Sequence, residues 1–211
     1  MIDPWDGEFI WQWCLNSGVI LSGILNTHQH HDHIKGNAFL LEQGVPVLTK
    51  IEMISPGVGK KETWSAPGHT SEHVVFWLED GEHRHCFVGD TLFQAGVGNC
   101  KHGGDPATLY HTLQELTQRL TPDTWLHVGH DYLERNAKFA LSVEPGNLQV
   151  QKLVAALADN PPTFERAAHQ WQFEFEINPF LRTKSSQLNL ATTVDRDEMA
   201  FKVLRQMRDN W

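Results

Sequence analysis

The stretch Thr27-His28-Gln29-His30-His31-Asp32-His33 places four histidines and one aspartate within seven residues. It follows directly after Val19–Asn26, an apolar run with β-branched residues that predicts a buried strand. Strand ends are where α/β folds place their chemistry. On an extended chain His28 and His30 point the same way, because side chains alternate with period two, so one metal ion could bind both.

Asp32 and His33 follow one turn later and could face a second ion beside the first. Imidazole combined with carboxylate suits zinc, iron or manganese, and the absence of thiolate ligands disfavours a closed structural zinc site. The alternative is a solvated polar loop that happens to be rich in histidine. Later segments of the chain argue against that alternative.

Three further segments each place a potential ligand after a glycine and beside a predicted strand. They are Gly68-His69-Thr70, Gly89-Asp90-Thr91 and Gly129-His130-Asp131. The glycine leaves room for the backbone to approach closely. Together the segments predict a metal centre built from seven side chains. These are His28, His30, Asp32, His33, His69, Asp90 and His130.

Strand and helix patterns alternate along the chain and predict a layered α/β domain. Strands are predicted at Val19–Asn26, Val45–Thr49, Val74–Leu78, His85–Val88 and Trp125–Val128, with Lys50–Thr63 a loop or irregular edge. Helices are predicted at residues 7–16, Ile34–Gln43, from Pro106 to Leu120, Asp131–Leu141, Leu148–Ala158, Thr163–Gln170 and Arg196–Arg208. A change in composition near residue 143 divides the chain into a metal-binding catalytic domain, residues 1–142, and a mostly helical appendage, residues 143–211.

Composition narrows the classes of function. The chain has 211 residues, of which 40% are hydrophobic and 20% charged, as expected of a globular protein. Its formal net charge of −9 argues against nucleic acid or an anionic membrane surface as a partner. No apolar run is long enough to cross a bilayer, no signal peptide is visible, and three distant cysteines form no disulfide framework. We therefore expect a cytoplasmic protein that is a monomer or a weak homo-oligomer.

The order HxHxDH, GHT, GDT and GH between residues 27 and 130 resembles the metallo-β-lactamase superfamily. The resemblance implies an αββα sandwich with a dinuclear site at one edge, here shortened at the N-terminus because members usually carry two strands before the segment Ile2-Asp3-Pro4. It also implies the ligand sets. One ion would be held by His28, His30 and His69, the other by Asp32, His33 and His130, with Asp90 bridging them.

Within the superfamily, seven segments resemble glyoxalase II, also called hydroxyacylglutathione hydrolase. They are Gly89–Phe93, Ala95–Gly98, Gly129–Tyr132, Asn136–Ala140, Glu144–Asn147, Asn178–Thr183 and Leu204–Trp211. This resemblance implies hydrolysis of the thioester S-D-lactoylglutathione, or a related acyl-glutathione, to glutathione and D-lactate. The attacking group would be a hydroxide bridging two divalent ions, with zinc expected first and iron or manganese as alternatives. Asp32 and Asp90 would be its catalytic residues.

The resemblance also places the substrate contacts. The family's basic positions that contact glutathione fall on Arg205 and Arg208, and its tyrosine beside the last metal histidine falls on Tyr132. In the substrate loop, Asn99 stands where the family commonly has a basic residue, and Lys101 where it has an aromatic one.

An acidic chain needs a local basic patch to bind an anionic substrate. For that patch the sequence offers Arg205 and Arg208, with Lys101, Arg182 or Lys184 in support. The remaining histidines near the motifs, which are His31, His73, His102 and His127, are expected to support the ligands or lie on the surface.

Three alternatives stay open at this stage. The first is a persulfide dioxygenase-like oxidoreductase on the same fold with a single iron. The second is a lactamase or nuclease of the superfamily, although the acidic charge disfavours a nuclease. The third is a truncated paralogue that binds metal but catalyses nothing, since missing strands would leave an uncovered sheet edge.

Overall fold

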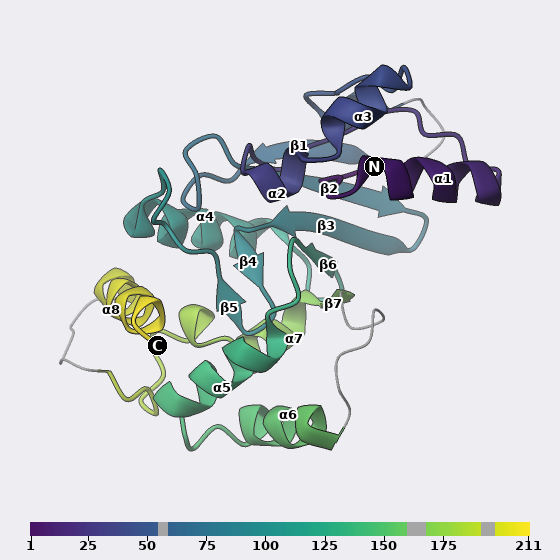
Figure 1. Ribbon diagram of the computed structural model, residues 1–211. Coiled ribbons are helices and arrows are strands. Elements are labelled where there is room, and N and C mark those ends of the chain that lie inside the picture. The colour runs from purple at the N-terminus through teal and green to yellow at the C-terminus, as the bar shows by residue number, and fades with distance from the viewer. Residues whose placement is uncertain (55–58, 160–167, 191–196) are drawn as a thin grey trace.

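The computed structural model describes residues 1–54, 59–159, 168–190 and 197–211, and a five-stranded sheet lies at its centre (Figure 1). The strand order is β1-β2-β3-β6-β7, and only β3 and β6 pair in parallel. The strands are β1 (Lys61–Ser65), β2 (Val74–Asp80), β3 (His83–Gly89), β6 (Trp125–Val128) and β7 (Ala168–Gln170). A separate hairpin joins β4 (Leu92–Phe93) to β5 (Gly96–Val97).

Strand β2 shows how the sheet separates two cores. Val75 and Trp77 pack into a core that also contains Leu113 of helix α4 (Pro106–Arg119). Phe76, on the opposite face, packs with Leu25 of the N-terminal segment in a second core. Successive side chains of a strand point to opposite faces, so one short strand supplies both layers. The apolar run at Val74–Leu78 is therefore a strand buried on both sides, as predicted.

Helix α4 covers the face of the sheet that Val75 and Trp77 occupy. Asp105 caps its first turn by accepting a hydrogen bond from the Thr108 N–H, and Pro106 occupies the first helical position. Its buried leucines recur on one face at helical spacing, as the sequence predicts. The other helices are α1 (Gly7–Ser17), α2 (His31–Ile34), α3 (Asn37–Glu42), α5 (Leu133–Val143), α6 (Leu148–Asp159), α7 (Trp171–Ile177) and α8 (Asp197–Asp209), with 3₁₀ turns η1 (Ile51–Met53) and η3 (Pro179–Leu181).

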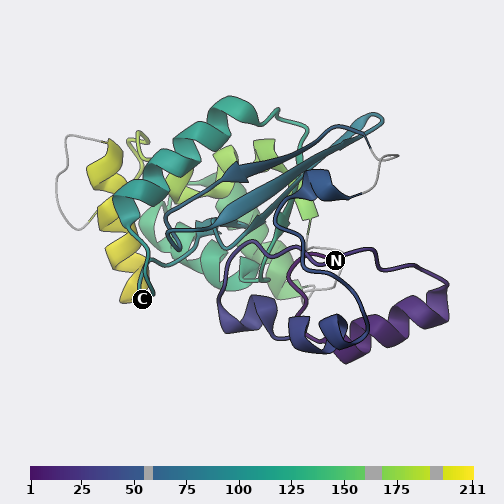
Figure 2. The ribbon, with the colours of Figure 1, turned by 90° about the horizontal axis from the view of Figure 1, so that it is seen from above.

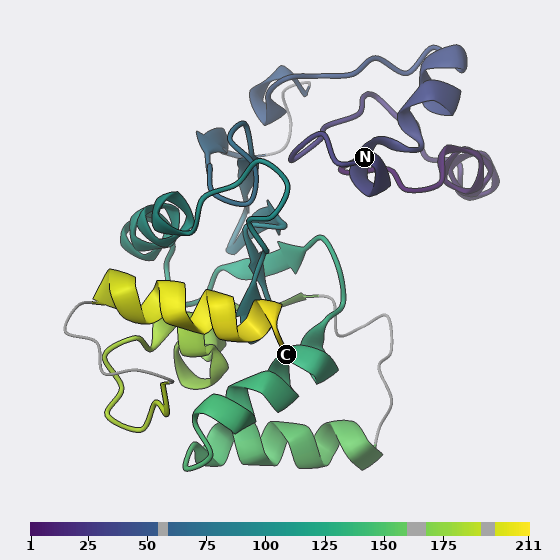
Figure 3. The same cartoon turned by 60° about the vertical axis from the view of Figure 1, so that its left-hand side comes forward.

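The N-terminal segment, with helices α1 to α3, lies on one side of the sheet, and helices α5, α6 and α8 lie beyond the other side (Figure 3). Figure 1 shows the N-terminal helices at the top and α5 and α6 at the bottom, and Figure 2 shows α4 across the sheet from the N-terminal helices. Two predicted strands in this segment, Val19–Asn26 and Val45–Thr49, are wrong, since they form only the isolated bridges Ile24–Val47 and Ile2–Leu25. Of their apolar residues, Ile24, Leu25 and Val45 are buried, whereas Val19, Ile20 and Val47 are exposed, and no neighbouring strand extends either bridge into a ladder.

Other corrections concern element type and boundaries. Residues 61–63, predicted as loop, begin β1 because they pair with β2 from Lys61 onward. The helix predicted at Ile34–Gln43 is divided into α2 and α3. Ala168–Gln170, predicted as the end of a helix, is strand β7, since pairing with β6 overrides local helix preference. Residues 55–58 and 163–167, and Arg196, lie outside the described residues.

The C-terminal part is mostly helical, as predicted, and it shares the main core. That core includes Leu113 and Leu126 from before residue 143 and Phe180, Phe201 and Leu204 from after it. The division of the chain at residue 143 therefore stays a prediction. In the described part of the chain, no helix has both the length and the apolar content needed to cross a bilayer.

Truncation of Phe76 tests whether the N-terminal segment is docked on the sheet. Phe76 is 1% exposed, so Phe76→Ala should lower the free energy of unfolding by about 3–5 kcal/mol, measured by urea denaturation. Phe9, on α1, is 67% exposed, and Phe9→Ala should change stability by less than about 0.5 kcal/mol. Equal effects of the two substitutions would contradict the described packing.

Candidate metal centre

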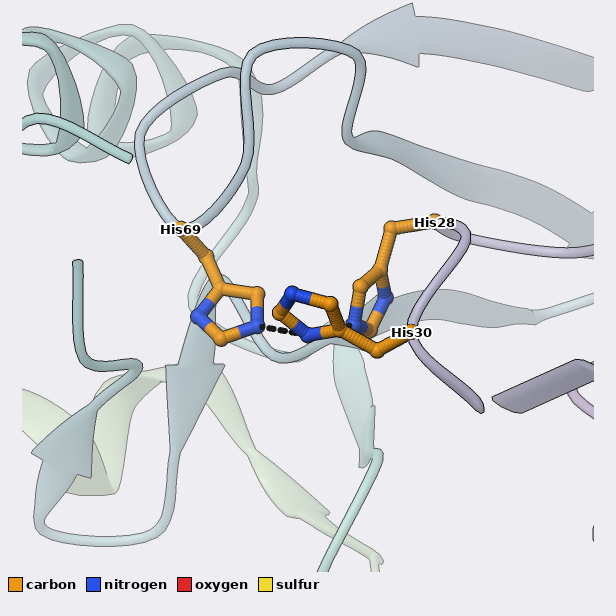
Figure 4. A group of neighbouring side chains, drawn as sticks. All are labelled: His28, His30 and His69. Atoms are coloured by element: carbon orange, nitrogen blue, oxygen red, sulfur yellow. Dashed lines mark hydrogen bonds between the residues drawn. The ribbon is translucent and has the colours of Figure 1, made fainter. Parts of the chain in front are cut away.

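Three of the expected ligands converge from two loops (Figure 4). His28 and His30 come from the segment before α2, and His69 comes from the turn between β1 and β2. His30 Nδ1 lies 3.0 Å from His28 Nε2 and 3.0 Å from His69 Nε2. Three imidazole nitrogens thus point at one position, which is the arrangement a single metal ion needs.

A second group forms directly beside the first. His33 Nε2 lies 3.2 Å from His130 Nε2, and the Asp32 carboxylate lies 3.1 Å from the same His130 nitrogen. His33 belongs to the short helix α2, whereas His130 follows the end of β6. The fold therefore brings Asp32, His33 and His130 together although the last is 97 residues away from His33 in sequence.

Asp90 lies between the two groups. Its Oδ1 is 3.3 Å from His33 Nε2, and its Oδ2 is 3.6 Å from His69 Nε2. Oδ1 is buried and receives no hydrogen bond of normal geometry from the described residues. One carboxylate oxygen thus faces each group, which is the geometry of a bridging ligand.

The outer nitrogens of two histidines determine which nitrogen faces inward. His69 Nδ1 donates to the carbonyl of Asn99 at 2.6 Å, and His33 Nδ1 donates to Asp3 at 2.8 Å. In each neutral ring the proton is therefore on Nδ1, and the lone pair of Nε2 points into the centre. Lone pairs and carboxylates that converge in a buried space repel one another unless cations lie between them, so the residues fit a pair of divalent ions.

The close packing of these histidines and carboxylates also determines which of them carry a proton. Burial, together with the charge of His33, lowers the pKa of His28 to about 2. Burial alone would lower the pKa of His33, but its contacts with Asp3 and Asp90 raise it to about 10. His33 in turn holds the pKa of Asp90 below its usual value, against the effect of burial. Without a metal the acidic centre therefore keeps a proton on His33, and an ion must displace it.

Glycines allow the two strand ends to approach this closely. A Cβ at Gly129 would collide with Asp90 Oδ1 and lie 2.9 Å from His33 Cε1. Gly89 has φ +48°, in the left-handed region that favours glycine, and a Cβ there would crowd Thr27 and His73. The small residue before each ligand is therefore required by space, as the sequence pattern indicates.

Two further residues, His73 and Asp3, hold the proposed ligands in place. His73, expected near the ligands or on the surface, is fully buried, and its Nε2 accepts a hydrogen bond from the Asp90 N–H at 3.2 Å. Asp3 was not predicted, although it also accepts hydrogen bonds from Thr27 N and Oγ1 at 2.8 and 2.7 Å. Only the long-range bridge between Ile2 and Leu25 places Asp3 here, so no local sequence signal could reveal it.

A cavity of about 280 Å³ opens beside the centre, and Tyr132 connects the two. The Tyr132 ring stacks on His130, with ring centroids 5.2 Å apart, and also lines the cavity. Burial and the charges of Asp90 and Asp32 raise the pKa of Tyr132, so its phenol stays protonated and can donate a hydrogen bond. The lining is completed by Phe93, Val97, Asn99, Lys101, His102, Arg135, Asn136, Arg205, Arg208 and Asp209.

The cavity is rich in cations although the chain is acidic. Lys101, Arg135, Arg205 and Arg208 line it, with Asp209 the one acid among its lining residues. Burial, and then the charges of Arg135 and Arg205, lower the pKa of Arg208. Bound anions would relieve this mutual repulsion, so the cavity suits an anionic ligand.

The two C-terminal arginines differ in their surroundings. Arg205 is buried and donates to the carbonyls of Val97 and Gly98 at 2.9 and 3.3 Å and to Asp209 at 3.0 Å. Arg208 donates one hydrogen bond to Asn136 at 3.2 Å and is more open to the cavity. Arg205 thus holds the loop after β5, while Arg208 keeps donors available.

Two of the cations offered for the basic patch lie elsewhere. Arg182 forms an ion pair with buried Glu144 at 2.9 Å, and Lys184 pairs with Asp197 at 3.2 Å. Neither lines the cavity, so this part of the prediction is wrong. Arg135 takes their place, and the sequence argument missed it because nothing in its local pattern distinguishes it from an exposed helix residue.

Two family models match consecutive parts of the chain. Residues 65–130 match the family model of the metallo-beta-lactamase superfamily, and residues 131–211 match that of the hydroxyacylglutathione hydrolase C-terminus. The ETHE1 structure from Myxococcus xanthus superposes with a TM-score of 0.61 at 20% identity, covering 99% of this chain and 78% of that one. The metallo-β-lactamase fold predicted from the sequence is confirmed.

Two relatives match over the whole chain. The hydroxyacylglutathione hydrolase of Polaromonas sp. (strain JS666) is 34% identical over 236 residues, covering 100% of this chain and 89% of that protein. The hydroxyacylglutathione hydrolase of Nitrosococcus oceani is 32% identical over 236 residues with the same coverage. Both matches extend over more positions than the 211 residues of this chain, so each relative has residues without a counterpart here.

Asp3 can be tested as the residue that orients His33. Asp3→Asn removes the negative charge behind His33 Nδ1, and loss of such an outer partner typically weakens metal binding by about 10–100-fold. Competition with a chelator measures this affinity. Glu8→Gln, an exposed acid on α1, is the control and should leave the affinity unchanged. Equal metal retention by all three proteins would remove the role assigned to Asp3.

Proposed function

The chain belongs to the hydroxyacylglutathione hydrolase family of the metallo-beta-lactamase superfamily, and from this we propose that it cleaves S-D-lactoylglutathione, or a related acyl-glutathione, to glutathione and D-lactate. It is an enzyme of the thioester hydrolase type. The observation that carries the finer proposal is the contact of Tyr132 with both His130 and the cationic cavity. A substrate held there by its anionic part would present its acyl group to the metal centre.

We assign the seven converging side chains as ligands. His28, His30 and His69 would hold one divalent ion, Asp32, His33 and His130 the other, and Asp90 both. Zinc suits this set of imidazoles and carboxylates best, with iron and manganese as alternatives. When bound, such a pair lowers the pKa of a water molecule and polarises a carbonyl group.

Asp32 is proposed to orient the attacking water. Its side chain is 43% exposed, and one of its oxygens faces His130, which leaves the other open to accept a hydrogen bond. The water oxygen adds to the acyl carbon and gives up one proton to solvent, the carbon–sulfur bond breaks with its electron pair leaving on the glutathione sulfur, and the acid product loses the remaining proton to solvent. Asp90, buried between the two groups, keeps them together throughout.

The leaving group needs little help from the protein. A thiol has a pKa of about 8.5, so glutathione can leave as the thiolate near neutral pH without a dedicated acid. The protonated Tyr132 phenol lies beside the centre and can donate a hydrogen bond to the substrate. We therefore give Tyr132 a binding role and not that of a general acid.

The cavity would hold the glutathione part. Its carboxylates match the free donors of Arg208 and of exposed Lys101, while the Asn99 side chain accepts a hydrogen bond from the Lys101 N–H and shapes that loop. Arg205 contributes positive charge and holds the loop after β5. In this proposal, residues 143–211 form the substrate-binding segment because α8 supplies both arginines.

A persulfide dioxygenase-like activity is the second candidate, since ETHE1 of Myxococcus xanthus shares the fold. At 20% identity that likeness concerns the fold alone. The convergence of two ligand groups on opposite sides of Asp90 favours two ions over a single iron.

The decisive experiment combines metal analysis with two assays on the purified protein. We expect two divalent ions per chain, release of glutathione from S-D-lactoylglutathione, loss of that activity on chelation, and no oxygen consumption with glutathione persulfide. One iron per chain with oxygen consumption would establish the dioxygenase instead. Fewer than two ions with no thioester cleavage would leave the proposal without support.

Arg208 offers a test of the cavity. Arg208→Met keeps the aliphatic contacts but removes the charge, so KM should rise by about tenfold while kcat stays within about threefold. Steady-state kinetics separate the two parameters. Lys184→Met removes an exposed cation outside the cavity and should change neither. An unchanged KM in Arg208→Met would exclude Arg208 from substrate binding.

A further inference from the structure

Two histidines on the central sheet, outside the candidate metal centre, are in contact with each other. His85 of β3 and His127 of β6 lie on the same face of two parallel strands, which adjoin in Figure 1. His85 Nδ1 is 3.0 Å from His127 Nε2. His127 precedes His130 by three residues, which separates the pair from that centre by about 10 Å along the strand.

The distance between these two nitrogens is similar to those between histidine nitrogens in the candidate metal centre. Within the metal centre, histidine nitrogens approach one another at 3.0, 3.0 and 3.2 Å. Two imidazoles bound to one zinc ion, each at about 2.0–2.1 Å, are about 3–3.4 Å apart. A separation of 3.0 Å is also that of a hydrogen bond in which one of the two nitrogens donates, so an ion bound here would take the place of the shared proton.

Both rings are held in place and available as ligands. His127 stacks on Phe87, with ring centroids 4.4 Å apart and planes 16° from parallel. Burial, and then the charge of His85, lowers the pKa of His127 to about 4, and burial also lowers the pKa of His85. Neutral imidazoles at neutral pH leave a lone pair for metal binding.

His83 provides a third imidazole. It lies two residues before His85 on β3, so both side chains point to the same face of the sheet. As placed, the two ring centroids are 6.4 Å apart, so His83 would join the pair only after its exposed side chain rotates. Asp80, opposite His83 in the register, adds a negative charge nearby.

We propose that His83, His85 and His127 form an additional site for a divalent transition-metal ion, with zinc as the ion that three imidazoles and a water suit. The ion joins β3 to β6 on the face opposite helix α4. It is distinct from the two ions of the catalytic centre and takes no part in thioester hydrolysis. Because it binds only the folded arrangement, it raises the stability of the sheet as free zinc increases.

Equilibrium dialysis of the zinc-loaded protein against Zn²⁺ tests the site. Wild type should take up one ion more than His85→Ala at the same free zinc concentration, and the midpoint of thermal unfolding should rise with added zinc in wild type but not in His85→Ala. His111→Ala removes an exposed histidine on α4, which pairs with Glu198, and should behave as wild type. Equal uptake by wild type and His85→Ala would overturn the proposal.

His83→Ala serves as a second variant, because His83 is exposed and its loss leaves the contact between β3 and β6 intact. Its dissociation constant for the additional ion should rise by at least about tenfold, the scale seen even for loss of an outer partner of a ligand. An unchanged constant would overturn the three-histidine site. Because the readout is a difference of one ion between variants, it holds whether or not the protein cleaves lactoylglutathione.

Discussion

The carboxylate of Asp90 lies between two groups of imidazoles, and much of the fold holds it there. Its position follows from the end of β3, where Gly89 turns the chain, and from Gly129, which leaves room for the carboxylate at the end of β6. The Asp90 backbone N–H is held by the hydrogen bond that it donates to His73 Nε2. The other six proposed ligands surround this carboxylate in a largely buried space, so positive charge must balance it, either from protonated His33 or from bound cations. The positions of the ligands and the packing of this sheet edge therefore depend on each other.

The metal centre and the cavity are linked by a short run of backbone. Arg205 of α8 donates to the carbonyls of Val97 and Gly98, and the next carbonyl, that of Asn99, accepts a hydrogen bond from His69 Nδ1–H. The last helix of the chain therefore helps orient a ligand that is 136 positions away in sequence. The guanidinium of Arg205 is committed to this loop, so its main effect on chemistry is through the placement of His69. Arg208, one turn later on the same helix, is the arginine with donors left for a ligand.

The sequence predicts the parts of this site whose signals are local. His28 and His30 are two residues apart, and a glycine precedes each later ligand. Both signals involve only residues that are neighbours in the sequence. Asp3 and Arg135 escaped prediction because only tertiary contacts bring them to the centre and the cavity. The same reason explains β7, which becomes a strand by pairing with β6, and Val19–Asn26, of which only Ile24 and Leu25 are buried in the core and in which no ladder forms. An apolar run alone therefore predicts neither burial nor strand pairing, because both depend on which segments lie alongside.

The net charge of the chain is negative, whereas the side chains that line the cavity carry mostly positive charge. A formal charge of −9 would repel an anionic substrate at long range, but screening limits that repulsion to about 8–10 Å at physiological ionic strength. Within that distance the ligand meets Lys101, Arg135 and Arg208 at the cavity. The inner end of the cavity leads to Tyr132 and the metal ligands, where the positive charge would come from ions instead of side chains. In the proposed function, affinity for the anionic thiol carrier and reactivity toward its acyl group depend on separate sources of charge, so substitutions in the cavity are expected to change binding without altering the centre.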